Sequence, residues 1–268
     1  MSAVQDKPQG APLLDAREIS KSFTRDGQSF EAIRGIDLQV HAGEFVSIIG
    51  PSGCGKSTLF NIVAGLMTPD RGSVRVDGRE TTGQPEACAL MPQKDLLFPW
   101  RSVLANTTLG LEIRGMRKAE ARRRAEPLFR TFGIDGTQKL YPFQLSGGMR
   151  QRAALLRTVI QGRPVMLLDE PFGALDSLTR TELQDWLLSV WQQEQWTVVL
   201  VTHDIREAIY LSDRVYVLGT DPGRVQEVIE VDLPRPRGVA TTEMVEFAQY
   251  ETRLTHALRL ARAGRADD

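Results

Sequence analysis

The strongest constraint on the fold of this chain is a glycine-rich stretch that directly follows a short apolar run. The run is Phe45–Ile49, and the stretch is Gly50-Pro-Ser-Gly-Cys-Gly-Lys-Ser57, which matches the pattern G-x-x-x-x-G-K-S/T. A helix is predicted over about Lys56–Ala64, with Gly65 placed to end it. A buried strand, a glycine-rich loop and a helix in this order are typical of the phosphate-binding loop of α/β proteins. We therefore expect an α/β fold with a nucleotide-phosphate site at this loop.

The residue types of this phosphate loop fit the chemistry of its ligand. Its glycines let consecutive backbone N–H groups curl around phosphate oxygens, and the start of the helix adds a partial positive charge. Lys56 can reach the β- and γ-phosphates of ATP, and the Ser57 hydroxyl can bind Mg²⁺. The residues expected to contact the nucleotide are Gly50, Pro51, Ser52, Gly53, Cys54, Gly55, Lys56, Ser57 and Thr58. Because the nucleotide covers the loop, we expect ATP to slow the alkylation of Cys54.

A second motif supplies the carboxylates of such a site. Val165-Met-Leu-Leu-Asp169-Glu170 is an apolar strand with two acidic residues at its carboxyl end, where α/β sheets bind ligands. Asp169 is predicted to hold Mg²⁺ through water, and Glu170 to polarise the attacking water as general base. Charged residues are common at strand ends, so this pair is informative only together with the phosphate loop. The two motifs together predict a P-loop NTPase.

The stretch Leu145-Ser-Gly-Gly-Met-Arg-Gln-Arg152 narrows the class. It resembles the signature motif of the ABC ATPase family, which is commonly LSGGQ, and the resemblance extends in order and spacing over about 13–230. Met149 stands where the family commonly has Gln. The residues that face phosphate in the family are intact, namely Ser146, Gly147 and Gly148. The resemblance implies a P-loop NTPase core of ABC type, with an antiparallel β subdomain and a helical subdomain that carries the signature motif.

The resemblance assigns roles to four further residues. Phe23 fits the aromatic residue that stacks on adenine, for which a ring face suffices, and a core phenylalanine at a strand end is the alternative. Gln93 fits the glutamine that contacts Mg²⁺ and water, and Asp176 fits the loop that communicates across a dimer. His203 follows another apolar strand, where it can contact the γ-phosphate and orient the water of Glu170.

The remaining sequence divides into segments of different composition. The expected segments are a disordered lead-in (1–12), an ATPase domain (13–230, with a helical subdomain at about 95–160) and a C-terminal extension (231–268). Strands are predicted at Leu13–Phe23 and Phe30–Val40, separated by a turn around Asp26-Gly27. Further strands are predicted at Phe45–Ile49, Val165–Asp169, Thr197–Val201 and Val215–Leu218. Helices are predicted at Arg117–Phe132, Gly147–Ile160 and about 242–262. Packing of the last helix on its own domain and packing on a partner remain equally open.

Composition bears on compartment and partners. The formal net charge is −1, so no global electrostatic reason exists to expect nucleic-acid binding, and the arginines around 122–124 are interpreted as a solvated helix face. Only two cysteines are present, Cys54 and Cys88, which fits a reducing compartment. The polar N-terminal sequence lacks the apolar stretch of a signal peptide, and no run approaches the roughly 18 apolar residues of a spanning helix. We expect a peripheral location on the cytoplasmic side of the inner membrane, through a partner.

The family resemblance also implies those partners. Two copies are expected to sandwich two ATP molecules head to tail, with the signature motif of one chain closing on the nucleotide held by Lys56 of the other. Separate transmembrane permease subunits are implied, and the apolar cluster Lys94–Trp100 is the expected docking site, with inward packing as the alternative.

The single ATPase unit is usual for importers assembled from separate subunits, which use an extracytoplasmic solute-binding protein. The stretches Leu96–Gly115 and Pro142–Arg152 look most like the nitrate/sulfonate/taurine subgroup, which includes importers of pyrimidine precursors. The alternatives are a soluble ABC ATPase acting on nucleic acid or ribosomes, and the ATPase subunit of an exporter.

Overall fold

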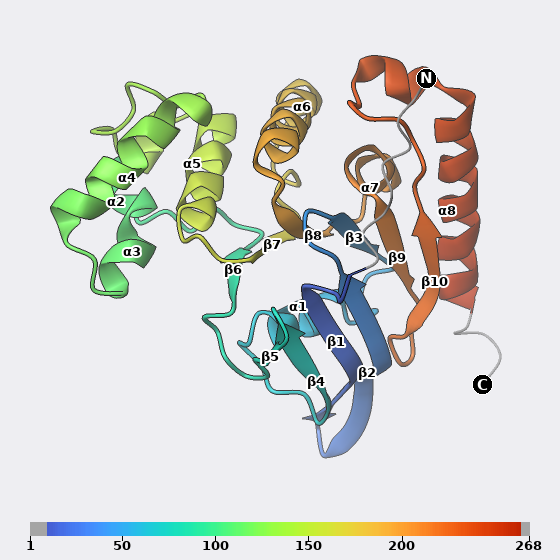
Figure 1. The fold of residues 1–268 in the computed structure, drawn as a ribbon. Coiled ribbons are helices and arrows are strands. Elements are labelled where there is room, and N and C mark those ends of the chain that lie inside the picture. Colours follow the sequence, from blue (N-terminus) through green and yellow to red (C-terminus); the bar gives the residue numbers. More distant parts are fainter. Residues whose placement is uncertain (1–9, 264–268) are drawn as a thin grey trace.

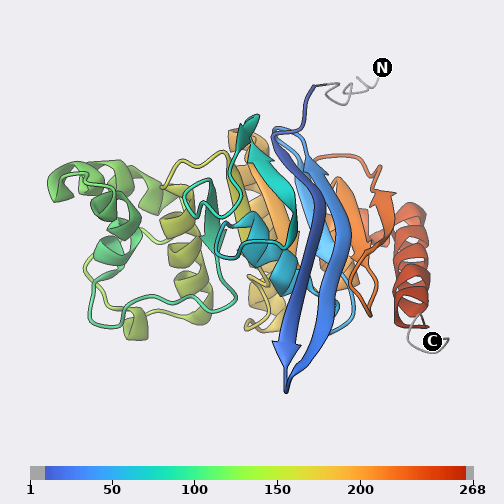
Figure 2. The same ribbon diagram turned by 90° about the horizontal axis from the view of Figure 1, so that it is seen from below.

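The chain forms two sheets, a set of helices above them and a helical arm at one side (Figure 1). The structure is a computed structural model and describes residues 10–263. Most of the expected lead-in, 1–12, therefore lies outside the described residues, and Gly10 to Pro12 have no regular secondary structure. The arm and the C-terminal helix lie at opposite ends of the molecule in both views (Figures 1 and 2).

The larger sheet has six strands in the spatial order β10-β9-β3-β8-β7-β6. Its strands are β3 (Phe45–Ile49), β6 (Cys88–Met91), β7 (Val165–Asp169), β8 (Thr197–Val201), β9 (Arg214–Leu218) and β10 (Val225–Glu230). Five of them run parallel, and β10 pairs antiparallel with β9 at the edge. The central strands β3 and β8 are buried at every residue, as expected for parallel strands that are covered on both faces.

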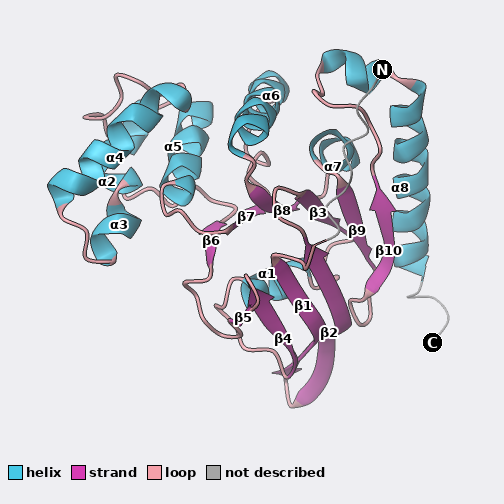
Figure 3. Cartoon of the chain, in the orientation of Figure 1, coloured by secondary structure: helices cyan, strands magenta, loops and turns pink. Residues whose placement is uncertain are grey.

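Two hydrophobic cores cover the two faces of this sheet. Successive side chains of a strand point to opposite faces, so Phe45 and Ile49 belong to one core while Val46 and Ile48 belong to the other. The first core is completed by side chains from α5 (Gly147–Val159), α6 (Ser177–Glu194), α7 (Ile205–Leu211) and α8 (Val245–Ala263). The second core is completed by α1 (Lys56–Val63) and the smaller sheet. Figure 3 shows α1 and α6–α8 on opposite sides of the strands.

The smaller sheet is antiparallel, with the order β2-β1-β4-β5. Its strands are β1 (Leu14–Arg25), β2 (Gln28–Val40), β4 (Arg71–Val76) and β5 (Arg79–Glu80). The hairpin of β1 and β2 turns through Asp26 and Gly27, which have φ values of +53° and +79°. Two residues with positive φ are what the tightest hairpin turn requires, and glycine adopts such angles without a steric cost. The turn predicted at this position is confirmed.

The helical arm contains α2 (Val103–Thr107), α3 (Leu109–Ile113), α4 (Lys118–Thr131) and α5. The predicted helices at Arg117–Phe132 and Gly147–Ile160 are confirmed to within a residue at each end. On α4, Ala121, Ala125 and Phe129 are buried at helical spacing, whereas the arginines at 122–124 are exposed. The expected solvated face of α4 is therefore present.

The C-terminal helix packs on its own domain. α8 contacts α7, β9 and β10, and its residues Phe247, Leu254, Ala257 and Ala261 are buried in the core above the larger sheet. The preceding segment is fixed by Arg237, which is buried and donates hydrogen bonds to the carbonyl oxygens of Ile209, Tyr210, Ser212 and Val231. Of the two arrangements open from the sequence, the structure has the first.

Candidate functional site

Four neighbouring parallel strands bring the predicted site residues to one edge of the larger sheet. The strands lie in the order β3, β8, β7 and β6, and their carboxyl ends are level, because Ile48 pairs with Val201 and Val201 pairs with Asp169. The residues that follow these ends are the phosphate loop after β3, His203 after β8, Asp169 and Glu170 at the end of β7, and Gln93 after β6. Ligands of α/β sheets bind at this edge.

The conformation of the phosphate loop depends on hydrogen bonds from the side chain of Lys56 and on the lack of a side chain at Gly55. The Lys56 ammonium donates hydrogen bonds to the carbonyl oxygens of Gly50 and Pro51, at 2.7 and 2.9 Å. Gly55 caps α1 with a φ of +88°, and a Cβ atom there would lie 2.2 Å from Cγ2 of Ile33. Any side chain at this position would therefore displace the loop from β2. Ser57 is exposed in the first turn of α1, beside the partial positive charge of its N-terminus.

Glu170 has its carboxylate held between the two other predicted catalytic side chains. Gln93 Nε2 donates a hydrogen bond of 2.9 Å to Glu170 Oε2, and His203 Nδ1 lies 3.3 Å from Glu170 Oε1. The backbone N–H of Glu170 continues the strand pairing by donating to the carbonyl of Val201. The φ of Glu170 is +43°, an unfavourable conformation for a residue with a side chain. Such strain recurs at functional sites, where surrounding contacts fix it.

Asp169 lies close enough to the phosphate loop to interact with Lys56. Burial raises the pKa of the Asp169 carboxyl, the adjacent Glu170 raises it further, and the charge of Lys56 opposes both effects. A carboxylate that is costly to ionise in isolation becomes a good ligand when a cation is brought beside it. The phosphate loop and the acidic pair, more than a hundred residues apart in sequence, thus form one site.

The signature motif is built as a helix N-terminus but lies away from this site. Ser146 caps α5 and accepts a hydrogen bond from the N–H of Met149, and Gly147 and Gly148 form the first turn. Within the described residues, no hydrogen bond or ion pair joins Ser146, Gly147 or Gly148 to the phosphate loop. Side chains of α5 belong to the core on one face of the sheet and those of α1 to the core on the other, so the two motifs begin helices on opposite faces.

Phe23 lies near the end of β1, and Asp176 directly precedes α6. Phe23 is half-buried, belongs to neither core, and its ring lies 5.9 Å from that of Phe30 on the neighbouring strand. The alternative of an ordinary core phenylalanine is therefore not supported. Asp176 caps α6 and accepts a hydrogen bond from the N–H of Thr179, which lowers the pKa of its carboxyl.

Sequence reasoning missed a polar cluster directly beneath His203. Arg180, Thr202, Asp204 and Glu207 line a small cavity together with Glu170 and His203. The pattern Asp204-x-x-Glu207 suggests an exposed capping box at the start of a helix. In the structure Glu207 turns inward instead and is only 6% exposed, a difference that depends on its contact with the distant residue Gln184.

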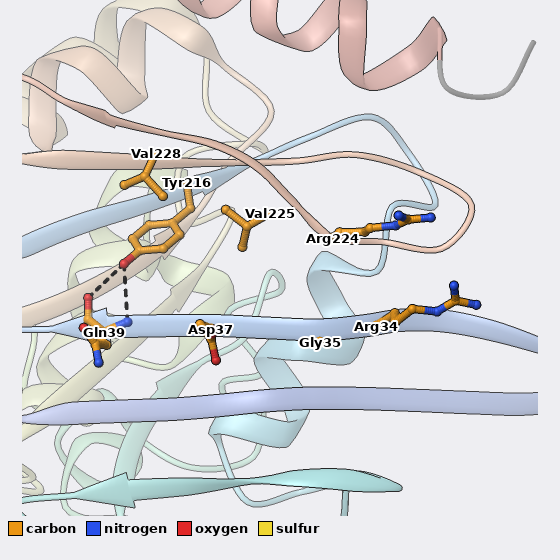
Figure 4. A pocket seen from close by; sticks show the side chains of 8 residues that line it. All are labelled: Arg34, Gly35, Asp37, Gln39, Tyr216, Arg224, Val225 and Val228. Carbon is orange, nitrogen blue, oxygen red and sulfur yellow. Dashed lines mark hydrogen bonds between the residues drawn. The ribbon is translucent and has the colours of Figure 1, made fainter. Parts of the chain in front are cut away.

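A second hollow among the described residues, larger than the cavity beneath His203, lies elsewhere. It measures about 520 Å³ and lies between β2 and the hairpin of β9 and β10 (Figure 4). The hydroxyl of Tyr216 is hydrogen-bonded to the backbone of Gln39, Arg34 pairs with Glu31, and Asp37 accepts from the N–H of Glu18. The side chains of Tyr216, Arg34 and Asp37 each have a partner, and none of them is an evident reactive centre.

Comparisons with known proteins agree with this geometry. The sequence profile described as ABC transporter matches residues 33–173. An uncharacterized ABC transporter ATP-binding protein of Methanocaldococcus jannaschii is 43% identical over 246 residues, covering 92% of this chain and 91% of that protein. An aliphatic sulfonates import ATP-binding protein of Bacillus cereus is 41% identical over 224 residues, covering 84% of this chain and 88% of that protein.

A solved structure has the same fold. It is a dimeric ATP-binding cassette in a post-hydrolysis state, bound to ADP and Pi, with a TM-score of 0.71, 30% identity and coverage of 84% of this chain and 99% of that chain. The chain belongs to the ABC transporter family. It is an ATP-binding subunit that hydrolyses ATP in support of transport. No helix of residues 10–263 has the length and apolar character needed to cross a membrane.

The structure changes one expectation about the phosphate loop. Cys54 is fully buried beneath the loop, and burial raises the pKa of its thiol although Lys56 partly opposes this effect. Alkylation needs an accessible thiolate. We therefore expect the Cys54 thiol to be alkylated slowly even without nucleotide. ATP should then change the rate of alkylation little, in contrast to the expectation from the sequence.

This expectation is tested with a Cys88→Ser variant, in which Cys54 is the single thiol. Its reaction with a maleimide should be slow with or without Mg-ATP and fast in urea. Rapid modification of the folded, nucleotide-free variant would contradict the buried position of Cys54.

Proposed function

We propose that this chain is the ATPase subunit of a membrane importer, in which two copies bind and hydrolyse two ATP molecules between them. The observation that carries the proposal is the carboxylate of Glu170, held between Gln93 and His203 at the edge that also carries the phosphate loop. An ionised carboxylate in such a position can accept a proton from water, as a general base must.

The nucleotide end of the site follows from the phosphate loop. When ATP binds, the Lys56 ammonium gives up its hydrogen bonds to the loop carbonyls and interacts with the β- and γ-phosphates instead. Mg²⁺ prefers oxygen ligands and commonly takes one or two from the protein and the rest from phosphate and water. Ser57 and Asp169 supply such oxygens, with Gln93 nearby, and the ion would neutralise the charge that develops on the phosphates.

The catalytic end uses Glu170, Gln93 and His203. Glu170 polarises the attacking water, Gln93 orients the carboxylate, and His203 contacts the γ-phosphate. Phe23, half-exposed at the end of β1, offers its ring face to adenine. Asp176, at the start of α6, takes part in communication between the two copies.

The separation of α5 from the phosphate loop supports a dimer. The N-terminus of α5 carries free N–H groups and a partial positive charge, which suits an anion. Ser146, Gly147 and Gly148 therefore close on the γ-phosphate held by a second copy, in a head-to-tail arrangement. ATP favours the closed dimer and hydrolysis releases it, so that the nucleotide shifts a two-state equilibrium.

An exposed apolar surface supports docking to a permease. The docking patch, defined as Leu96, Phe98 and Trp100, has exposed fractions of 58, 37 and 72%. The buried side chain of Asn106 holds this segment rigid through hydrogen bonds to the N–H and carbonyl of Phe98 and the carbonyl of Arg101. Rigid, exposed aromatic side chains next to the loop of Gln93 fit a site that senses the nucleotide and binds a membrane partner.

The relatives support import as the direction and sulfonate-type solutes as the cargo. The proteins named for aliphatic sulfonates import match this chain over most of its length. We assign the cargo to the nitrate, sulfonate, taurine and pyrimidine-precursor class, delivered by an extracytoplasmic solute-binding protein. The chain is then peripheral on the cytoplasmic side of the membrane, bound through the permease.

The Glu170→Gln variant tests the assignment of the general base. The amide keeps the shape of the side chain but cannot take a proton, so turnover should fall by about a hundredfold or more while ATP binding persists. With Mg-ATP, the variant should elute as a stable dimer in size-exclusion chromatography. Glu194→Gln, at an exposed position on α6, is the control and should keep normal turnover. Normal turnover of Glu170→Gln would refute its role.

Replacement of Phe98 and Trp100 by alanine tests the docking patch. Because both side chains are exposed, the free energy of unfolding should change by no more than about 0.5 kcal/mol per substitution. Recovery of a permease with the tagged chain from gently solubilised membranes should be lost. Ile113→Ala, which removes from α3 an apolar side chain about as exposed as that of Trp100, should leave recovery intact. Equal recovery with the double variant would place the permease elsewhere.

A further inference from the structure

Glu207 is a buried carboxyl group directly beneath the switch loop, which we define as residues 202–204. The loop leads into α7, whose N-cap Asp204 accepts hydrogen bonds from the N–H groups of Arg206 and Glu207. Gln184 Nε2 on α6 donates a hydrogen bond of 3.2 Å to Glu207 Oε2. The other oxygen, Oε1, is buried without a hydrogen-bond partner in the described structure. A buried oxygen without a hydrogen-bond partner is energetically costly, so a bound water is the expected partner of Oε1.

A cavity joins this carboxyl to the catalytic pair. It measures about 10 Å³ and is lined by Glu170 and His203 as well as by Arg180, Asp204 and Glu207. Arg180 also has a buried atom without a partner, Nε, although its other nitrogens lie 3.1 Å from the carbonyl of Leu175 and 3.8 Å from Asp204. The volume is about what the centre of one water molecule requires, and two unsatisfied polar groups line it.

We propose that Glu207 is a positioning residue of the hydrolytic site. With one bound water and Arg180, it holds the switch loop where His203 reaches Glu170, and it does so as a neutral carboxylic acid. The proposal rests on the proposed roles of Glu170 and His203. A neutral carboxyl donates one hydrogen bond and accepts others, so it can satisfy the water and Gln184 together.

Burial favours the neutral form of Glu207. Burial is the main effect that raises the pKa of Glu207 to about 8; Thr202, Arg180 and Gln184 oppose it, and Asp204 adds to it. Glu170 and His203 face the same cavity from the loops after β7 and β8. Above pH 8 an ionised Glu207 would be the third carboxylate there, and Arg180, which already faces Asp204, is the one permanent cation lining the cavity.

ATP turnover should fall when Glu207 loses its proton. The neutral form of Glu207 predominates below its pKa and is lost as the pH rises through about 8. If the neutral form holds the switch loop, ATP turnover must fall over that range. ATP binding by the phosphate loop lies apart from the cavity and should be affected little.

The test measures kcat and KM for ATP between pH 6 and pH 9.5 in the full chain and its variants. Wild-type kcat should fall with a midpoint near pH 8. Glu207→Gln imitates the neutral acid, so it should keep kcat at pH 7 within about twofold and lose the alkaline fall. Glu207→Ala should lower kcat at pH 7 by about tenfold or more with little change in KM, because misplacement of a catalytic group by about 1 Å can cost up to a hundredfold.

A matched control exists on another face of α7, the one that contacts α8. Arg206 pairs with Glu251 of α8 at 2.9 Å, in a partly exposed ion pair that does not line the cavity. Glu251→Gln removes a carboxylate that contacts the same helix, and it should keep the alkaline fall with its midpoint unchanged. If Glu207→Ala does not fold, the profile of Glu207→Gln decides the question alone.

The proposal is overturned if Glu207→Gln keeps the wild-type alkaline fall, or if it loses as much kcat at pH 7 as Glu207→Ala. It is also overturned if the Ala variant changes KM and not kcat. A failure of the proposed role of Glu170 as general base is distinguishable from this result. In that case Glu170→Gln would keep full turnover at every pH, whatever the Glu207 variants do.

Discussion

The parallel pairing of β3, β8, β7 and β6 is the constraint on which the rest of the site depends. Its register makes the strand ends level, so that the chain segments leaving them must start at the same edge. Lys56, Asp169, Glu170, Gln93 and His203 meet there although they come from four separate stretches of sequence. The hydrophobic cores on the two faces hold this register, because a slip by one residue would exchange the side chains of a strand between two cores that are each closely packed around a particular set.

The same two-sided packing separates the site into halves. α1 follows the phosphate loop on one face, whereas α5 and its signature motif lie on the other. Each chain therefore carries the phosphate loop and the signature motif at the starts of helices that pack on opposite faces of the sheet. In the proposed function, a second copy of the chain completes the site, and the nucleotide is bound between the two copies.

The helix behind His203 is fixed from two sides. On one side Glu207 contacts α6, and on the other Arg206 contacts α8. Arg237 adds hydrogen bonds from the C-terminal segment to the last carbonyls of α7. The C-terminal segment is thus in contact with the helix that follows the switch loop.

Much of this could be predicted from the sequence, because the informative signals are local. The strand before Gly50, the turn at Asp26 and Gly27 and the helix starting at Gly147 each follow from a few neighbouring residues, and so do the motifs that carry Lys56 and Glu170. The sequence analysis did not predict β10, which has alternating exposure at an edge, or the inward turn of Glu207. β10 is an edge strand that, within residues 10–263, pairs only with β9, the strand directly before it, so its signal in the sequence is weak. The inward turn of Glu207, in contrast, depends on Gln184, 23 residues earlier in the chain. The burial of Cys54 was missed for the same reason, since Leu218 and Gly223 help to cover it.

The head-to-tail closure of two copies is the central claim, and a crosslink measures it most directly. One chain carries Ser52→Cys in its phosphate loop and the other Met149→Cys in its signature helix, both with Glu170→Gln to prolong the closed state. Treatment with a short bifunctional thiol reagent should join the two different chains when Mg-ATP is present, and should not join like chains. Crosslinks between like chains, or no ATP-dependent crosslink between unlike ones, would contradict the account.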